Sequence, residues 1–128
     1  YREMSIIPRQ SDYPRFPDYD KHYDGYCKFF LYGDTKEKIP DNIKIFNKVG
    51  LAYGFVIDNA YIIDITNNVE FLLTAVIYSN SNETMNDDDY DYEKTSIPFL
   101  ASLGRKIYDL ELKRYKKVLP DFQIFKNL

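Results

Sequence analysis

The chain has 128 residues, of which 45% are hydrophobic and 17% aromatic, enough to bury the core of one domain. Its net charge of -3 provides no basic surface for neutralising phosphates, which disfavours a nucleic-acid partner. Cys27 and His22 are the only residues of their types, so neither an internal disulfide nor a zinc site of several Cys and His ligands can form. No apolar run approaches the roughly 18 residues of a membrane span, and no motif indicates a cofactor.

Residues 1–38 form a leader rich in tyrosine and proline. Pro8, Pro14 and Pro17 restrict their own backbone and that of the preceding residues, so the leader should be extended or turning. An aromatic cluster within residues 25–33 predicts one short helix that ends at a glycine. The chain begins with Tyr1 rather than Met, and we expect it to be cut from a longer parent.

Three β-rich runs follow at short intervals, over residues 43–49, 55–65 and 69–78. Asn67 and Asn68 lie between the second and third runs and suit a tight turn, because asparagine tolerates left-handed backbone angles. The three runs therefore predict an antiparallel meander. The third run is apolar on both parities, which predicts a strand that is covered on both faces.

One cover for this sheet is a C-terminal helix. It is predicted to begin near Pro98, and its apolar residues recur at helical spacing, namely Leu100, Leu103, Ile107 and Leu110. The fold class is thus α+β, an antiparallel three-stranded meander packed by a long C-terminal helix, with residues 39–128 as the sheet-and-helix part of a single incomplete domain. The cover of the second face is not apparent, unless residues 26–31 supply it, which again points to missing parent sequence.

Several polar or reactive residues have ordinary structural interpretations. Residues 79–93 are acidic, but they lack the glycine and terminal glutamate of a calcium-binding EF-hand loop and are expected to be a solvated loop. Cys27 lies among aromatic residues and is expected to be a buried, inert thiol. His22 has no nucleophile partner in its surroundings, and most of the 13 tyrosines are expected to be structural.

Lys48, Val49 and Gly50 lie at the end of the first β run, and a glycine-containing turn leads into the second run, which contains the pair Asp58 and Asn59. From about residue 39 to about residue 118, this order resembles the C-terminal part of the penicillin-recognising serine hydrolases, the class A β-lactamases and their transpeptidase-fold relatives. In that family the strand carries Lys-Thr-Gly, while Ser-x-x-Lys supplies the nucleophile. No serine of this chain is followed three positions later by lysine.

The resemblance implies a partial β-lactamase-like fold and roles for four residues. Lys48 would be the catalytic-site lysine that helps to hold the substrate carboxylate, and Gly50 would let the substrate approach the strand. The backbone N–H of Leu51 would form half of an oxyanion hole. Val49 stands where the family has a hydroxyl residue that binds the carboxylate. Losing that donor would cost about 1.5–3 kcal/mol of recognition.

The leading hypothesis is therefore the C-terminal fragment of a β-lactamase-like serine hydrolase, inactive alone, whose nucleophile lies upstream in the parent. By resemblance, that parent is periplasmic or an exported cell-envelope protein. The expected partners are the remainder of the parent chain and a second copy of this chain, because exposed edges and apolar faces invite association. Two alternatives stay open. One is a non-catalytic binding module derived from the same fold, and the other is an unrelated α+β binding domain.

Overall fold

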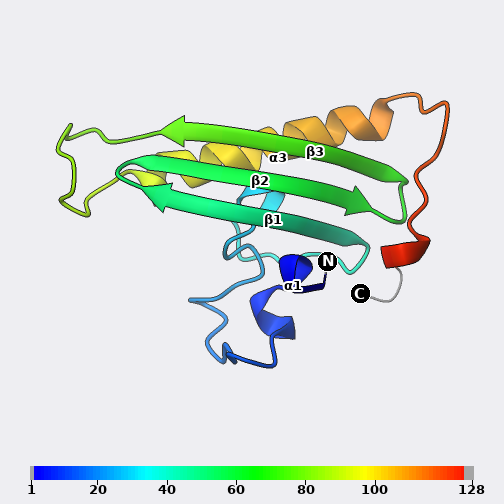
Figure 1. Ribbon diagram of the computed structural model, residues 1–128, viewed down its shortest axis with the longest axis horizontal. Helices are drawn as coiled ribbons and strands as arrows, with labels where there is room; N and C mark the ends of the chain where they lie inside the picture. Colours follow the sequence, from blue (N-terminus) through cyan, green and yellow to red (C-terminus); the bar gives the residue numbers. More distant parts are fainter. Residues whose placement is uncertain (1, 126–128) are drawn as a thin grey trace.

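The sheet is an antiparallel meander in the order β1-β2-β3, and the computed structural model describes residues 2–125 of the chain. Strand β1 is Ile43–Ala52, β2 is Phe55–Asp64 and β3 is Val69–Tyr78. Figure 1 shows β2 between the other two strands. The predicted α+β class and antiparallel meander are confirmed. Strand β1 runs past the predicted end because its turn comes only at Tyr53 and Gly54, which both have positive φ, as a two-residue hairpin turn requires.

The turn between β2 and β3 is fixed by a buried carboxylate. One oxygen of Asp64 accepts hydrogen bonds from the backbone N–H groups of Thr66 and Asn67, and Asn68 has a φ of 53°. Burial opposes ionisation of Asp64, but hydrogen bonds to its oxygens, led by that from the Tyr108 hydroxyl, bring its pKa below the usual value. The predicted tight turn is confirmed.

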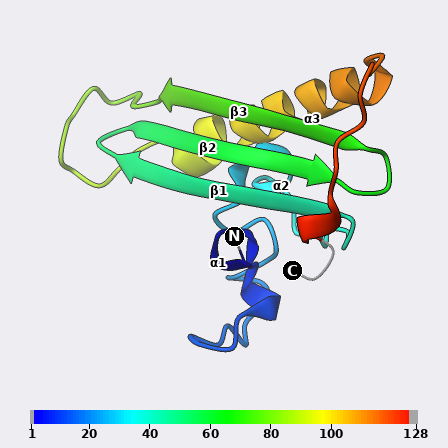
Figure 2. The ribbon, with the colours of Figure 1, turned by 45° about the vertical axis from the view of Figure 1, so that its right-hand side comes forward.

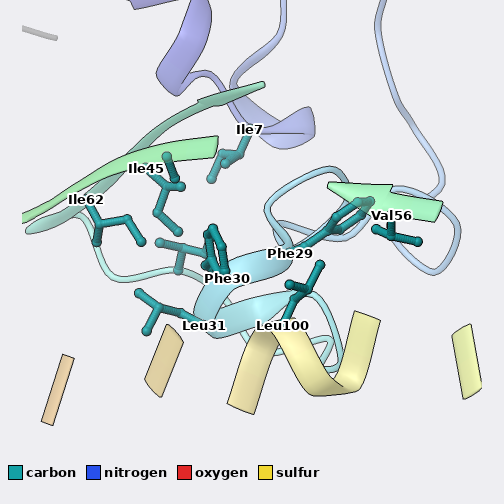
Figure 3. Packing of buried hydrophobic residues seen from close by; sticks show 10 residues of the cluster. Ile7, Phe29, Phe30, Leu31, Ile45, Val56, Ile62 and Leu100 are labelled. Carbon is teal, nitrogen blue, oxygen red and sulfur yellow. The ribbon is translucent and has the colours of Figure 1, made fainter. Parts of the chain in front are cut away.

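The main core lies between the inner face of the sheet and helix α3, Ile97–Lys113. Figure 3 shows Phe30 and Leu31 inserted between strand residues such as Ile62 and Leu100 of the helix. Gly104 of α3 lies directly against this insertion. The predicted C-terminal helix is confirmed, with its end at Lys113. Among the described residues, no helix combines the length and the apolar composition that crossing a bilayer requires.

The segment that carries Phe30 is the short helix α2, Phe29–Tyr32, and it corrects the prediction of one regular helix in residues 25–33. Phe30 has a ψ of 136° and Leu31 a φ of 73°, so the helical backbone is interrupted. The physical reason is that a buried carboxylate, Asp58, accepts hydrogen bonds from the N–H groups of Phe29 and Phe30. The contact holds these groups toward the sheet.

The remaining elements are short. Helix α1 is Arg2–Ser5, and single turns of helix occupy Pro8–Gln10, Tyr92–Ser96 and Gln123–Phe125. As the leader was predicted to do, much of residues 11–28 turns without regular structure. Figure 2 shows the leader below β1 and the C-terminal segment passing from α3 around the start of β3 to the outer face of the sheet.

This C-terminal segment covers only one end of the outer face. Phe122 and Phe125 pack there against Phe46 of β1 and Ile63 of β2. Beyond that end the face is bare, since Leu72 is 78% exposed and Val76 60% exposed. The prediction that the third strand is covered on both faces is therefore wrong. Strand β3 is an edge strand, and the C-terminal segment packs on the outer face of β1 and β2 instead.

Candidate functional site

The residues predicted to form a site lie on the open edge of β1. In an antiparallel strand, alternate residues direct both main-chain groups toward the neighbouring strand or away from it. The odd-numbered residues of β1 face away from β2, because the Ile43 N–H bonds to Pro40 and the carbonyl of Ile45 accepts a bond from a lysine. The Lys48 ammonium also lies at this edge, where it donates to the Val49 carbonyl at 2.6 Å.

Leu51 continues this alternation, so its N–H points away from the sheet. No other residue within 2–125 accepts a hydrogen bond from that N–H, and the Leu51 side chain is 45% exposed. The structure thus brings together the Leu51 N–H and the Lys48 ammonium at one open edge. Both groups are donors from which an anionic oxygen can accept a hydrogen bond.

Val49 and Gly50 face opposite sides of the sheet. Val49 is half-buried and packs against the main core on the inner face, which explains an apolar residue at this position. A Cβ built on Gly50 would lie 2.9 Å from the Cγ2 methyl of Ile57 on the outer face. The close approach of Ile57 therefore explains why a glycine occupies position 50.

A cavity of about 710 Å³ opens beside the end of β1. Leu51 and Cys27 line it, together with a set of rings, Tyr23, Tyr26, Phe29 and Tyr92. Charged residues of both signs form part of the lining, and one of them, Lys36, is paired with Asp20 at 2.9 Å. Such a cavity can hold an apolar or aromatic group with a polar group at its rim.

A buried polar network fixes the wall between this cavity and the sheet. The Lys28 ammonium, on a residue only 5% exposed, donates to the carbonyls of Met4 and Ile45 and to the side-chain oxygen of Asn47, at 2.6, 2.9 and 2.8 Å. The Asn47 amide donates in turn to Asp58 and to the Cys27 carbonyl, each at 2.9 Å. All three donors of Lys28 are satisfied, so the network is structurally complete.

Burial dominates the electrostatics of this network. It lowers the pKa of Lys28 to about 8, although the nearby Asp58 charge acts in the opposite direction. Burial also raises the pKa of Asp58, against hydrogen bonds from Asn47, Phe30 and Phe29 that favour its ionised form. Both ions therefore carry a cost of desolvation that the hydrogen bonds offset only in part. Because it lies between aromatic residues in the sequence, Lys28 was not predicted to belong to this site.

The pKa of Lys28 predicts a pH dependence of stability. Between about pH 8, the pKa of Lys28 in the folded chain, and pH 10.5, the ordinary pKa of a lysine, the unfolded chain binds more protons, so the unfolding free energy should rise with pH. The limiting slope is about 1.4 kcal/mol per pH unit. Denaturant unfolding at pH 7.5, 8.5 and 9.5 measures it. A Lys28→Met variant keeps the tyrosines and Cys27 but lacks this contribution, so an equal slope in both proteins would contradict the assignment.

The described residues lack a nucleophile paired with a base. Cys27 is half-buried with a φ of 58°, and burial raises the pKa of its thiol, which disfavours the thiolate. His22 packs against the rings of Phe16 and Tyr26. Within 2–125, no serine or cysteine side chain hydrogen-bonds to a histidine or lysine side chain, and the buried Ser79 and Ser96 hydroxyls bond to each other.

Comparisons of this chain with protein-family models, with curated proteins and with solved structures found no match.

Proposed function

We propose that this chain is the C-terminal part of a β-lactamase-like serine hydrolase and forms one wall of its acyl-transfer site. The observation that carries the proposal is the outward-facing Leu51 N–H on the same open edge of β1 as the Lys48 ammonium. The meander with its C-terminal helix is the arrangement that the resemblance implies, and it places this edge next to the aromatic cavity.

In this proposal each group has one role. A serine hydroxyl from sequence outside these 128 residues attacks the substrate carbonyl. The Leu51 N–H donates a hydrogen bond to the oxygen that becomes negative, and the donor is already fixed by the β ladder, so little reorganisation is needed. The Lys48 ammonium attracts the substrate carboxylate, and the adjoining cavity takes an apolar or aromatic group of the substrate.

A non-catalytic binding module of the same fold is the second candidate, and one observation favours it. Val49 belongs to the packed core, so the strand offers no hydroxyl at the position where the family binds the substrate carboxylate. A relative that has lost this donor would keep the edge and the cavity for binding, without efficient turnover.

Labelling with a fluorophosphonate separates the two candidates. We expect the longer polypeptide that contains this sequence to be labelled at a serine and residues 1–128 alone to remain unlabelled. Leu51→Pro removes the outward N–H but no ladder bond, and should lower the labelling rate about 100-fold or more. Leu51→Ala, which keeps the N–H, is the matched control. No labelling of the folded longer protein would favour the binding module, and equal rates for the two variants would exclude the Leu51 role.

A further inference from the structure

Strand β3 has a free edge. The Ser79 N–H bonds to the Gly54 carbonyl, so the odd-numbered residues of β3 face β2 and the even-numbered ones face outward. Residues 72, 74, 76 and 78 thus present a row of main-chain donors and acceptors. No other residue in the described range 2–125 hydrogen-bonds to these groups. Figure 1 shows β3 as the outermost strand on this side, with α3 behind it.

Lysines partly block the edge of β1, whereas the edge of β3 has no such cover from residues 2–125. Lysines cover two outward carbonyls of β1, since Lys28 binds that of Ile45 and Lys48 binds that of Val49. Residues 71–78 contain no charge and no proline. Long, uncharged edges of this kind are templates for pairing with another strand.

The side chains of β3 are also incompletely covered on the core side. Inward-facing Val69 at its start is buried. In contrast to the fully buried inward residues of β2, the next four inward residues of β3 remain partly exposed: Phe71, Leu73, Ala75 and Ile77. On α3, the exposed Phe99 and Leu110 lie on the same helix face as the half-buried Leu103 and Ile107. Together these four residues form an apolar stripe. This stripe lies opposite Arg105, which faces α2, and so continues the apolar surface from β3 around the edge.

We propose that β3 pairs with β3 of a second copy of this chain, in antiparallel orientation about a two-fold axis at Ala75. This register opposes Leu72 to Tyr78 and Thr74 to Val76, and leaves the start of β3, where the C-terminal segment crosses, unpaired. The four outward residues of each strand then form about eight hydrogen bonds, and apolar residues meet apolar residues on both faces. The two sheets become one six-stranded sheet.

The charges at the two ends of β3 are complementary in this arrangement. The acidic loop follows the end of β3, with Asp87, Asp88 and Asp89 all exposed. A basic cluster, Lys113, Arg114, Lys116 and Lys117, begins at the last residue of α3, and the Lys116 ammonium binds the Asn68 carbonyl just before β3 begins. Antiparallel pairing brings the acidic loop of one copy to the basic cluster of the other. The association should therefore weaken as salt is added.

The size of the surface sets the expected strength. Seven paired residues of strand and the stripe on α3 together bury on the order of 1,000 Å² in total, the lower bound for a specific interface. We therefore expect a weak dimer. The proposal goes beyond the hydrolase proposal and is independent of it, because the candidate donors lie on the β1 edge, at the other side of the sheet.

Sedimentation velocity of residues 1–128 over about 1 to 200 μM tests the association. We expect a concentration-dependent dimer. Thr74→Pro removes an outward N–H without breaking the ladder to β2, and should weaken the dimer by about tenfold or more. Thr74→Val keeps the N–H and should leave it unchanged, and Thr74→Lys supplies a second disruptive variant if proline lowers stability. A monomer at every concentration, or equal dimers in all variants, would overturn the proposal.

Cross-linking tests the register. Thr74→Cys and Val76→Cys chains, when mixed and oxidised, should form a disulfide between unlike copies, because the opposed Cα atoms lie about 5.5 Å apart. Each variant alone places its two cysteines on a diagonal of about 7–8 Å and should not cross-link. The wild-type chain, oxidised in the same way, shows how much cross-linking Cys27 causes on its own. Failure of the mixture to cross-link more than the separate variants would overturn the two-fold axis at Ala75.

Discussion

Replacing Lys28 with methionine should lower the unfolding free energy by about 3–5 kcal/mol, the usual cost of removing one member of a buried charged network. The ammonium satisfies two carbonyl oxygens and the Asn47 side chain, all away from solvent. Methionine has a similar length but no donor, so these acceptors would stay buried without it. The charge of Asp58 would also lose its buried counter-charge. Since single domains are stable by about 5–15 kcal/mol, this is a large fraction of the total.

Urea unfolding at pH 7 measures the effect, and the matched control is Lys44→Met. Lys44 lies on β1 as well, but no hydrogen bond or ion pair is formed by its side chain among residues 2–125, so its removal should change stability by about 0.5 kcal/mol or less. A double variant that adds Asp58→Asn should lose less than the sum of the single changes, because the two charges share Asn47. Strict additivity, or a Lys28→Met protein as stable as wild type, would show that the network is not coupled.

The strands and the C-terminal helix could be predicted because local patterns encode them. Residues 55–64 are rich in β-branched and aromatic residues, Asn68 accepts a positive φ, and Pro98 begins a helical repeat. Besides the interrupted helix α2, the wrong prediction concerned the cover of β3. An apolar run on both parities indicates that both faces avoid polar residues, but it does not distinguish a covered strand from an edge strand that is open to another chain.

The network around Lys28 could not be predicted, since its members are far apart in sequence and each looks ordinary alone. Lys28 meets Asn47 and Asp58 only when residues 24–31 fold beneath the sheet. One signal was present. Lys28 lies between Cys27 and Phe29, inside an aromatic run that is expected to be buried. A lysine that is buried with such a run requires hydrogen-bond partners. For the candidate site, the sequence predicted the residues of the β1 edge, and the outward direction of the Leu51 N–H required the strand register.

Two glycine-to-alanine changes should differ sharply, although the same methyl group is added in each. A Cβ on Gly25 would lie 2.0 Å from the backbone oxygen of Tyr32, and Gly25 is buried. Backbone cannot give way as a side chain can, so Gly25→Ala should displace α2 and cost about 3 kcal/mol or more. A Cβ on Gly50 would lie 2.9 Å from the Cγ2 methyl of Ile57, a side chain at the open outer face that can shift where backbone cannot, so Gly50→Ala should cost less, about 1–2 kcal/mol.

Thermal unfolding of the two variants against wild type measures this difference, and it bears on the proposed site as well. Because α2 forms part of the cavity wall through Phe29, Gly25→Ala should also open the aromatic cavity. Gly50→Ala should keep the fold, so any loss of serine labelling in the longer protein would reflect the approach of substrate to the β1 edge rather than unfolding. If Gly50→Ala destabilised the chain as much as Gly25→Ala, the Ile57 side chain would be held rigidly, and Gly50 could not serve as a clean probe of that edge.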